Sequence, residues 1–457
     1  MQGSEVASTS IRESIDRAPM SPYQLLIVGV CFLIVLAEGY DLLLMAFAVG
    51  GVAEEWGLNG SQTGILLSSA LFGMAIGSVF VAPLADRIGR RAQTLACLAL
   101  VTLAMGASAI TGDVTLLALC RLLTGIGIGG LVVSLPVVAA EFSPKRRRST
   151  MIALYTAGLP LGGVTGALIA GALIASYSWR ASFVVGALLT LVLFIVVFFL
   201  LPESIDYLAA RRPRRALESI NATLAKMRIA PIDALPEPVP AAQRQVRSAV
   251  FRGRNGVRTA LLSLAFFVML AAFYFATSWT PRLLEQSGLS AQQGISGGLV
   301  LNFGGAAAAL IFSALAFRFK ARPLTIISFA GAAVAFVLMS VAFGDFATTL
   351  VVAVAVGMFT NACATGMFAI APDCFPAAVR STGVGFAAGV GRVGAIVAPL
   401  LAGVLIDFGW TAPSLFLIFT VPLVLGGIAV ALIGLPALRP EGETESAAVE
   451  REAVEAV

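Results

Sequence analysis

Four charged side chains lie inside otherwise apolar stretches of the sequence, and they are the residues best placed to do chemistry. Glu38 and Asp41 are three residues apart, so on a helix they are neighbours on one face. Arg121 and Arg392 lie in two later apolar stretches. An ionisable group in such a span costs roughly 2.5 to 3.5 kcal/mol on insertion scales, so each needs a partner or a use. Two negative and two positive charges predict a paired interior that faces protein.

The chain has no histidine, which excludes imidazole proton shuttles, Ser-His-Asp triads and histidine metal sites. Any proton handled here must therefore be carried by a carboxylate. A desolvated carboxylate beside a removable arginine can exchange its proton at working pH. We interpret Glu38 and Asp41 as proton acceptor and gate, with Asp41 the stronger candidate because it lies deeper. The alternative is a static ion pair with Arg121. Gly39, between the two acids, is expected to loosen the helix locally.

Arg392 is interpreted as the group that binds an anionic substrate. A planar guanidinium in a dry cavity suits bidentate binding of a carboxylate, whereas the alternative is a structural ion pair. Aromatic and amide side chains in the apolar stretches are further candidates for a substrate pocket, although single aromatics more often pack between helices or anchor at the interface. These candidates are Tyr40, Tyr155, Tyr274, Trp279, Asn302 and Asn361. Trp279 also lies near a predicted outer end and suits an aromatic belt.

The elements that carry these residues are predicted to be membrane-spanning helices. The chain has 457 residues, of which 58% are hydrophobic and only 12% charged, with a mean hydropathy of +0.94. A soluble domain has about twice that charged fraction. The apolar residues form continuous runs of about 20 or more, which favours helices over the alternation of a barrel. The twelve runs lie near 24–52, 62–84, 93–111, 115–141, 150–176, 181–201, 258–285, 292–317, 323–343, 347–372, 381–407 and 412–436.

The distribution of basic residues predicts the orientation in the membrane. If both termini are cytoplasmic, 26 of the 30 Lys and Arg residues lie in cytoplasmic segments, as the positive-inside tendency requires. We therefore expect a multi-pass protein of a bacterial cytoplasmic (inner) membrane, whose macromolecular surroundings are the lipid bilayer. The net charge of +5 then reflects topology, and it does not indicate nucleic-acid binding. The five cysteines lie in or beside apolar runs, so neither disulfides nor a thiolate metal site is expected.

An internal repeat divides the chain into two halves. Arg148-Ser149-Thr150 recurs as Arg380-Ser381-Thr382 at an offset of 232 in the numbering, and the same offset carries Gly162 onto Gly394. The pattern predicts an N-terminal segment over 1–23, six-helix bundles over 24–201 and 258–436, a cytoplasmic linker over 202–257 and an acidic, disordered tail over 437–457. A short helix is expected near 216–227. Transporters built from such repeats bind substrate near the midplane, where the halves meet.

A charged loop after the second run is predicted to form a cytoplasmic gate. It contains Asp86, Arg87, Arg90 and Arg91. Glu141 ends the fourth run, and the basic residues from 145 to Arg148 follow it. Ion pairs between this loop and the Glu141 end must break when the cytoplasmic side opens, and together they bias a two-state equilibrium. A proton-coupling role is a further interpretation of Glu141, and positive charge that only sets topology is the alternative for the loop.

Four motifs resemble a known family. The loop from Gly77 through Pro83-Leu84-Ala85-Asp86-Arg87 to Gly89-Arg90-Arg91 is similar to the signature loop of the major facilitator superfamily, and Arg121 to Gly130 resembles its fourth-helix motif. Within that superfamily, Glu38-Gly39-Tyr40-Asp41 resembles the first-helix motif of the aromatic acid:proton symporters. The run from Arg380 to Ile396 resembles the eleventh-helix pattern of that family. The resemblance covers all twelve runs.

The resemblance implies an all-α fold of twelve helices and proton-driven uptake of benzoate-type acids. It further implies that the first-helix acids and Arg121 act in proton coupling and that Arg392 faces the substrate carboxylate. Two positions depart from the family pattern. Glu38 replaces an aspartate, so the carboxylate reaches one methylene further. The loop over 316–323 lacks the Gly and Asp of the second signature copy, so its gate is expected to depend on other contacts.

Two other functions remain open from the sequence. A drug or metabolite exporter of the same fold is one, because residues 158–163 partly resemble the fifth-helix motif of antiporters, although a cation exporter has no need of Arg392. A sensor that binds ligand without translocating it is the other, although neither linker nor tail is long enough for a folded domain. No nucleophile, metal or phosphate-binding arrangement indicates an enzyme. We expect a monomer that uses protons as coupling ion and no other cofactor.

Overall fold

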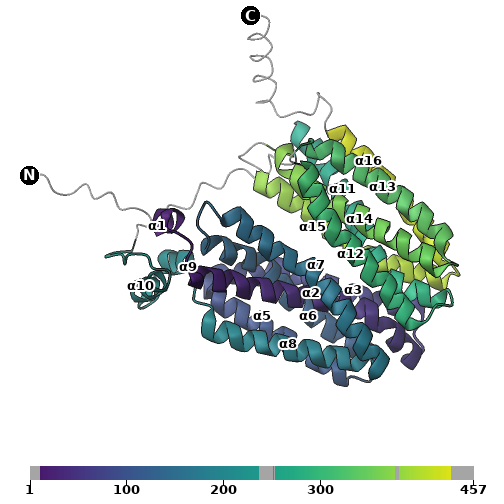
Figure 1. Ribbon diagram of the computed structural model, residues 1–457, viewed down its shortest axis with the longest axis horizontal. Helices are drawn as coiled ribbons and strands as arrows, with labels where there is room; N and C mark the ends of the chain where they lie inside the picture. The colour runs from purple at the N-terminus through teal and green to yellow at the C-terminus, as the bar shows by residue number, and fades with distance from the viewer. Residues whose placement is uncertain (1–10, 236–250, 252, 317, 376–379, 434–457) are drawn as a thin grey trace, which may run out of the picture. The chain divides into compact units, whose positions relative to one another are not determined.

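The computed structural model describes residues 11–235, 251, 253–316, 318–375 and 380–433. Within these ranges the regular elements are all helices (Figure 1). Twelve of the helices are long and apolar enough to cross a membrane, which confirms the predicted all-α class and number of spans. Continuous apolar runs form helices here because a helix satisfies its backbone hydrogen bonds within one segment.

The first six spans are formed by α2, α3 with the turns that follow it, and α5 to α8. Their bounds are α2 Pro22–Trp56, α3 Gly60–Ile76, α5 Arg90–Ile110, α6 Val114–Glu141, α7 Arg148–Ser176 and α8 Trp179–Leu200. A π-helical turn (η1, Gly77–Val81), a 3-10 turn (η2, Ala82–Leu84) and the one-turn helix α4 (Ala85–Ile88) connect α3 to α5. The predicted signature loop is thus helical over most of its length.

The last six spans repeat this order. Their helices are α11 Gly253–Gln286, α12 Ala291–Ala316, α13 Ala321–Ala342, α14 Phe346–Ile370, α15 Arg380–Asp407 and α16 Ala412–Ile433, with the 3-10 turn η4 (Ala371–Cys374) after α14. The offset of 232 in the numbering carries the first residue of α6 onto that of α14 and the first residue of α7 onto that of α15. The repeat in the sequence is therefore a repeat of helices.

Three short helices lie outside the spans. Helix α1 (Ile11–Arg17) precedes the first span, and α9 (Ile205–Arg211) and α10 (Ala216–Lys226) follow α8. The predicted short helix near 216–227 corresponds to α10. Neither α1 nor α9 was predicted. The predicted acidic tail and the linker residues 236–250 lie outside the described residues.

Contacts divide the chain into two compact units. Unit 1 comprises Met1–Ala48 and Ser69–Ala242, and unit 2 comprises Val49–Ser68 and Gln243–Val457. The predicted division into two bundles placed all of α2 and α3 in the first, whereas the end of α2 and the start of α3 pack within unit 2. There the carboxylate of Asp407 accepts hydrogen bonds from the backbone N–H groups of Gly60 and Ser61, at 2.7 and 2.8 Å.

Close helix crossings in unit 1 depend on glycine. A Cβ at Gly39 would lie 2.1 Å from the carbonyl oxygen of Leu159, and one at Gly162 would lie 2.0 Å from that of Leu36. The backbones of α2 and α7 therefore touch, as small residues permit. The expectation that Gly39 loosens α2 is wrong, since α2 is one continuous helix and this glycine serves packing against α7.

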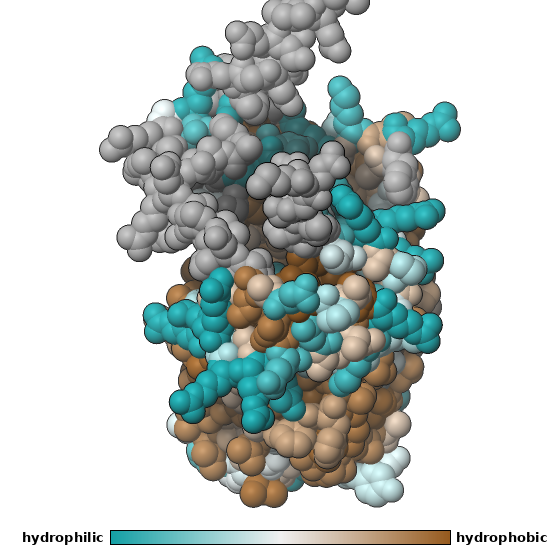
Figure 2. Space-filling view, turned by 90° about the vertical axis from the view of Figure 1, so that its left-hand side faces the viewer, coloured by the Kyte–Doolittle hydropathy of each residue, from teal (hydrophilic) through white to brown (hydrophobic). Residues whose placement is uncertain are grey.

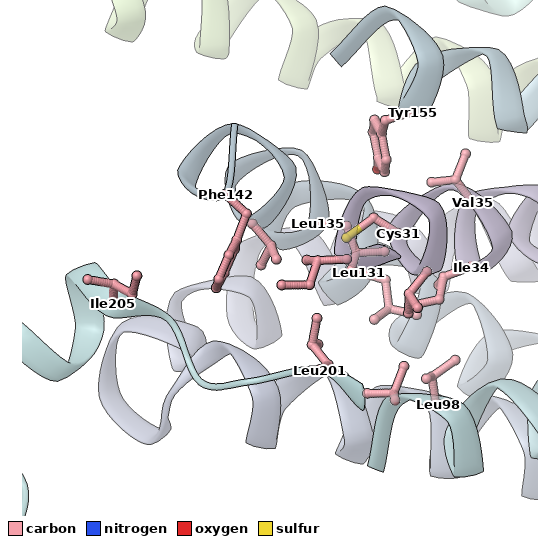
Figure 3. Packing of buried hydrophobic residues seen from close by; sticks show 14 of the residues in the cluster. Cys31, Ile34, Val35, Leu98, Leu131, Leu135, Phe142, Tyr155, Leu201 and Ile205 are labelled. Carbon is pink, nitrogen blue, oxygen red and sulfur yellow. The ribbon is translucent and has the colours of Figure 1, made fainter. Parts of the chain in front are cut away.

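The short helices pack onto one end of unit 1. Ile11 and Ile15 of α1, and Ile205 and Leu208 of α9, join a buried cluster with residues of the spans. Figure 3 shows part of this cluster, in which Cys31, Leu98, Leu131 and Phe142 point toward one another. The three short helices therefore form a cap on the bundle, because their apolar faces are buried against it.

Unit 2 packs α11 against α15 and α16, and α12 and α13 against α14. The rings of Phe275 on α11 and Phe419 on α16 stack with their centroids 4.1 Å apart. Of the α15 glycines, Gly391 and Gly394 touch α11, whereas a Cβ at Gly385 or Gly389 would meet nothing within 4 Å. Close helix contact therefore requires glycine at Gly391 and Gly394 but not at Gly385 and Gly389.

Candidate functional site

The central feature of unit 1 is a buried ion pair between α2 and α6. Both terminal nitrogens of Arg121 donate to the carboxylate of Asp41 at 2.8 Å, and Nη2 also donates to its backbone oxygen at 3.3 Å. The side chains of Arg121 and Asp41 are 0% and 1% exposed. The predicted pairing of Asp41 with Arg121 is confirmed. A bidentate pair sealed from water is strong when formed and costly to leave half-paired.

Aromatic packing closes the other side of this pair. The guanidinium carbon of Arg121 lies 5.5 Å from the centroid of the Phe183 ring on α8. The Arg121 Nε is buried and has no hydrogen-bond partner among the described residues. Arg121 thus uses two of its nitrogens on Asp41 and retains one unused donor in the interior of the bundle.

Glu38 lies one helical turn before Asp41 but is not part of the ion pair. Its side chain is 4% exposed, and neither carboxylate oxygen has a hydrogen-bond partner in the described part of the chain. Burial of an unpaired carboxylate anion is very unfavourable, so a buried carboxyl group without a partner is favoured in its neutral form. The two acids of the first span therefore have different surroundings, which their spacing did not reveal.

A small cavity joins the two acids. It is lined by Glu38 and Asp41, by the Thr190 hydroxyl-bearing side chain of α8, and by apolar side chains of α2, α5 and α6, with about 230 Å³ of space between the lining atoms. Those apolar side chains are Ile34, Ala37, Leu98, Val101, Ile128 and Leu131. The Glu38 carboxyl thus points into the interior of unit 1.

A second charged cluster lies at the end of unit 1 where α6 ends. Arg90 forms an ion pair with Glu141, and the Ser204 hydroxyl donates to the same carboxylate at 2.7 Å. Twenty residues of helix separate Arg121 from Glu141, a distance of about 30 Å at 1.5 Å per residue. The predicted ion pair between the loop and Glu141 is confirmed, but the structure does not bring Glu141 to the buried acids with which it was grouped for proton coupling.

The other residues of the predicted gate contact α8 and α9. The backbone N–H of Arg91 donates to Glu203 at 3.1 Å, and its guanidinium donates to the backbone oxygen of Phe198 at 2.6 Å. Asp86 and Arg87 are exposed and contribute backbone oxygens. Arg211 Nε donates to the backbone oxygen of Asp86, and the Tyr207 hydroxyl donates to the backbone oxygen of Arg87.

Helix α1 fastens the same end of the bundle. Arg12 donates to the backbone oxygens of Glu141 and Ala140, at 2.8 and 3.1 Å, where the last turn of α6 leaves carbonyls without helical partners. Arg148, a predicted gate residue, forms an ion pair with Asp16 of α1. Arg148 is thus paired with a residue of α1. Asp86 and Arg87 accept hydrogen bonds from residues of α9.

Arg392 and Tyr274 are the predicted substrate residues that unit 2 brings together. They lie on α15 and α11, which pack against each other. Both side chains are partly exposed. An accessible guanidinium beside a phenol offers charge-assisted and neutral donors to a carboxylate.

Three other predicted pocket residues are buried in packing. The Trp279 indole is 0% exposed and donates to the backbone oxygen of Pro399 at 3.0 Å, so it is not an interface anchor. Tyr40 donates to the backbone oxygen of Ser182 at 2.7 Å. Tyr155 lies in the buried cluster of Figure 3. Each of these rings is enclosed by its own unit in this structure, and its role in substrate binding stays a prediction.

The two predicted amide residues are partly exposed and lie on α12 and α14. Asn302 donates to the backbone oxygen of Gly298 in its own helix at 2.8 Å, and Asn361 packs over Gly305. These local contacts leave each amide with unused hydrogen-bonding groups. Their role in substrate binding stays a prediction.

The loop that departs from the signature pattern uses backbone acceptors in place of carboxylates. Arg322 donates to the backbone oxygens of Val430 and Ala431 at the end of α16, at 3.2 and 2.7 Å. Arg258 donates to that of Cys374 at 3.5 Å. The expectation that the gate at this loop depends on other contacts stays a prediction.

Several residues of the charged clusters were missed from the sequence. Glu203, Ser204, Arg12 and Asp16 belong to polar segments whose residues show no strong periodicity, so nothing in the sequence paired them with the loop. One signal was available, because a serine before a short segment with apolar residues at helical spacing is typical of a helix N-cap. Ser204 caps α9 by accepting a hydrogen bond from the Tyr207 N–H. Among the described residues, no group of three His, Cys, Asp or Glu side chains is placed to hold a metal ion.

The sequence profile of the Major Facilitator Superfamily matches residues 30–344 and 300–456. The 4-hydroxybenzoate transporter of Pseudomonas aeruginosa is 31% identical over 433 residues, which cover 94% of this chain and 97% of that protein. The gallate transporter of Pseudomonas putida is also 31% identical, over 95% of this chain and 97% of its own length.

Solved structures share the fold. A bacterial homologue of the human lysosomal transporter Spinster, in an inward-facing and occupied conformation, has a TM-score of 0.73 at 15% identity, covering 93% of this chain and all of that one. The inward-open xylose transporter of Escherichia coli has a TM-score of 0.71 at 17% identity. The match covers 92% of this chain and 97% of that one. Twelve spans with buried charges define a multi-pass membrane transporter and not an enzyme. The chain belongs to the major facilitator superfamily and, within it, to the family of aromatic acid transporters.

Proposed function

We propose that this protein takes up an aromatic monocarboxylate together with protons, by alternating access. The observation that carries the proposal is the division of the charges. A sealed carboxylate and arginine pair with an unpartnered acid lies in unit 1, and a partly exposed arginine lies in unit 2. Relatives named as 4-hydroxybenzoate and gallate transporters support the substrate class.

Arg392 is proposed to bind the substrate carboxylate, with Tyr274 beside it. A guanidinium presents paired N–H donors that match a carboxylate, and hydrogen bonds to charged groups are stronger than neutral ones. The partial exposure of Arg392 supports this role, because a substrate must reach it. Arg121 is less suited, since both of its terminal nitrogens already bind Asp41.

Glu38 is proposed to hold the coupled proton, and Asp41 to be the counter-ion of Arg121. The sequence favoured Asp41 as the proton carrier, but both oxygens of Asp41 accept from arginine, whereas those of Glu38 accept from nothing in the described structure. Loss of the Glu38 proton would place a second negative charge beside the ion pair and compete for Arg121, whose Nε has no partner among the described residues. Proton release and rearrangement of the pair are coupled in this way.

We further propose that both termini face the cytoplasm of a bacterium, that the chain lies in the inner membrane, and that one chain is the working unit. The distribution of basic residues supports the orientation. The presence of both charged sites in one chain supports a monomer. The pairs among Arg90, Glu141 and Ser204 then lie on the cytoplasmic side, where a gate must break them to open.

Uptake of radiolabelled 4-hydroxybenzoate into proteoliposomes tests the proposal. An inward pH gradient is expected to drive accumulation, and dissipation of the gradient with a protonophore is expected to abolish it. Liposomes without protein correct for passive entry of the neutral acid. Uptake that ignores the gradient, or gradient-driven accumulation that survives Glu38→Gln at the wild-type rate, contradicts the coupling. Accumulation driven only by an outward substrate gradient would indicate exchange.

A further inference from the structure

The turn between α9 and α10 carries an unusual concentration of exposed cations. Arg211, Arg212, Arg214 and Arg215 are all exposed, around Pro213. Arg212 and Arg215 have positive φ values of 48° and 65°, a conformation that residues with a Cβ adopt rarely. The turn is thus a defined structure that gathers four guanidinium groups in a short segment.

Hydrogen bonds attach this turn to the loop between α3 and α5. Arg211 Nε donates to the backbone oxygen of Asp86 at 3.0 Å, and the Tyr207 hydroxyl donates to that of Arg87 at 3.3 Å. Beneath the turn, Leu208 of α9 is buried in the core cluster of unit 1. The position of the arginines relative to the spans is therefore fixed within this unit.

An exposed apolar surface lies on the elements next to the turn. Phe80 in η1 and Phe199 in α8 are 70% and 76% exposed, and Leu84 just before α4 and Ile88 at its end are also exposed. In a membrane protein such side chains face lipid acyl chains. Figure 2 shows hydrophilic and apolar side chains adjoining on the face that carries α9 and α10. The contact of Arg211 with Asp86 places the turn beside the segment that carries Leu84 and Ile88, so the cations lie close to this apolar surface.

High exposure weakens the ion pairing of this turn. Arg90 with Glu141 and Arg148 with Asp16, at the same end of unit 1, are pairs whose side chains are at most about a third exposed. In the turn, Arg215 lies 3.8 Å from Glu218, and these side chains are 82% and 76% exposed, where such pairs contribute little. An anionic ligand can therefore compete with such exposed partners for these guanidinium groups. Basic clusters directly beside a span on the cytoplasmic side attract anionic lipid.

We propose that Arg211, Arg212, Arg214 and Arg215 bind the headgroup of an anionic phospholipid in the cytoplasmic leaflet, with its acyl chains against the apolar surface of η1, α4 and α8. The proposal rests on the orientation given under the proposed function. Because the turn also holds the backbone of Asp86 and Arg87, a lipid bound there would fasten the signature loop to the membrane surface.

Native mass spectrometry of the purified full-length protein tests this site. Phosphatidylglycerol and phosphatidylcholine are offered together to three proteins, and the amount of each lipid bound is compared. The proteins are the wild type, the turn variant R212Q/R214Q/R215Q and the control variant K145Q/R146Q/R147Q. Each triple variant removes three exposed cytoplasmic charges from unit 1, and Arg211 is kept because it binds Asp86. The preference for phosphatidylglycerol is expected to fall about tenfold in the turn variant and less than twofold in the control.

Absence of a preference in the wild type, or an equal fall in both variants, would overturn the proposal. Displacement of phosphatidylglycerol by soluble glycerol 3-phosphate would also overturn it, in favour of a site for free phosphate. Gel filtration and circular dichroism check that the variants fold. A cysteine at Ala210, which is exposed, reports orientation through labelling by an impermeant maleimide. Labelling from outside intact cells would refute the orientation, while the lipid competition itself does not depend on transport.

Discussion

The two sets of six spans share a scaffold but differ in their buried charge. The same offset of 232 in the numbering relates Asp113, whose carboxylate accepts from the Leu116 N–H at the start of α6, to Asp345, which accepts from the Thr348 N–H at the start of α14. Gly125 and Gly357 are related in the same way, and a Cβ on either would lie within about 2 Å of a carbonyl oxygen of the neighbouring helix.

Arginines at the ends of corresponding helices repeat as well. Arg91 at the start of α5 donates to Phe198 near the end of α8, and Arg322 at the start of α13 donates to Val430 near the end of α16. The donors and the acceptors are thus related by the same offset, to within one position. These contacts satisfy terminal carbonyls, so they are part of the scaffold.

The buried charges do not repeat. The positions that correspond to Glu38, Asp41 and Arg121 are occupied by Leu270, Phe273 and Ala353. The position that corresponds to Arg392 is occupied by Pro160. A scaffold common to both halves thus carries the proposed proton site in one half and the proposed anion site in the other. Separation of this kind allows each site to be altered without direct disruption of the other.

The largest expected effect follows from breaking the pair in the first half. Arg121→Gln leaves the Asp41 carboxylate buried without its cation, which costs roughly 3–5 kcal/mol. Uptake is expected to be abolished and the melting temperature to fall. Thermal unfolding in detergent and uptake in proteoliposomes measure the two effects.

The double variant Asp41→Asn with Arg121→Gln is the matched control for this change. It removes both charges, so most of the lost stability is expected to return while proton-driven uptake stays absent. A single variant as stable as the wild type would show that the pair is not the buried unit that its exposure indicates.

The next effect belongs to the second half. Arg392→Gln is expected to raise the KM for 4-hydroxybenzoate about 10- to 100-fold, as the loss of a hydrogen-bonded charge predicts, with little change in thermal stability because Arg392 is partly exposed. Arg392→Lys keeps the charge but not the paired donors, and should lie between. Unchanged KM in both variants would remove Arg392 from the substrate site.

A smaller effect distinguishes the corresponding ends of α6 and α14. Glu141 is buried and accepts from Arg90 and Ser204, whereas Asp373, its counterpart in the repeat, is exposed. Glu141→Gln is expected to cost about 1–3 kcal/mol, and Asp373→Asn less than about 0.5 kcal/mol. Denaturation monitored by a cysteine-reactive dye compares them. Equal losses would mean that the two ends are equivalent.

The smallest effect should be shared by both halves. Asp113→Ala and Asp345→Ala each remove a helix cap, and each is expected to lower the melting temperature by a few degrees at most. Hydrogen bonds from Thr348 lower the pKa of Asp345. Its contribution is therefore present above the pKa of the unfolded chain and lost as the pH falls through the lower pKa of the folded state. A pH-independent effect of Asp345→Ala would contradict the cap.

The scaffold was predictable because its signals are strong and local. Long apolar runs predict the spans, and the repeat around Arg148 and Arg380 predicts their order. The Asp41 and Arg121 pair was predictable from charge balance in apolar surroundings. That the Glu38 carboxylate has no hydrogen-bond partner among the described residues was not predictable, because the partners of an acid depend on which neighbouring helices face it.

Contacts between distant polar segments could not be predicted. The cap of α1 and α9 depends on Arg12 reaching the last turn of α6 and on Ser204 reaching Glu141, and single polar residues carry no signal for such long-range pairs. Trp279 appeared suited to an aromatic belt from its position along the chain. Its burial depends on the approach of α15, which brings the backbone oxygen of Pro399 to the indole.

Proton movement coupled to substrate tests the central claim most directly. Proteoliposomes loaded with a pH-sensitive dye report proton influx on addition of 4-hydroxybenzoate, and counterflow of labelled substrate reports binding and exchange without a gradient. For Glu38→Gln, the account predicts counterflow near the wild-type rate with no protein-dependent proton influx. Arg392→Gln should lose both signals at low substrate concentration. Wild-type proton influx in Glu38→Gln would contradict the assignment of the coupled proton to Glu38.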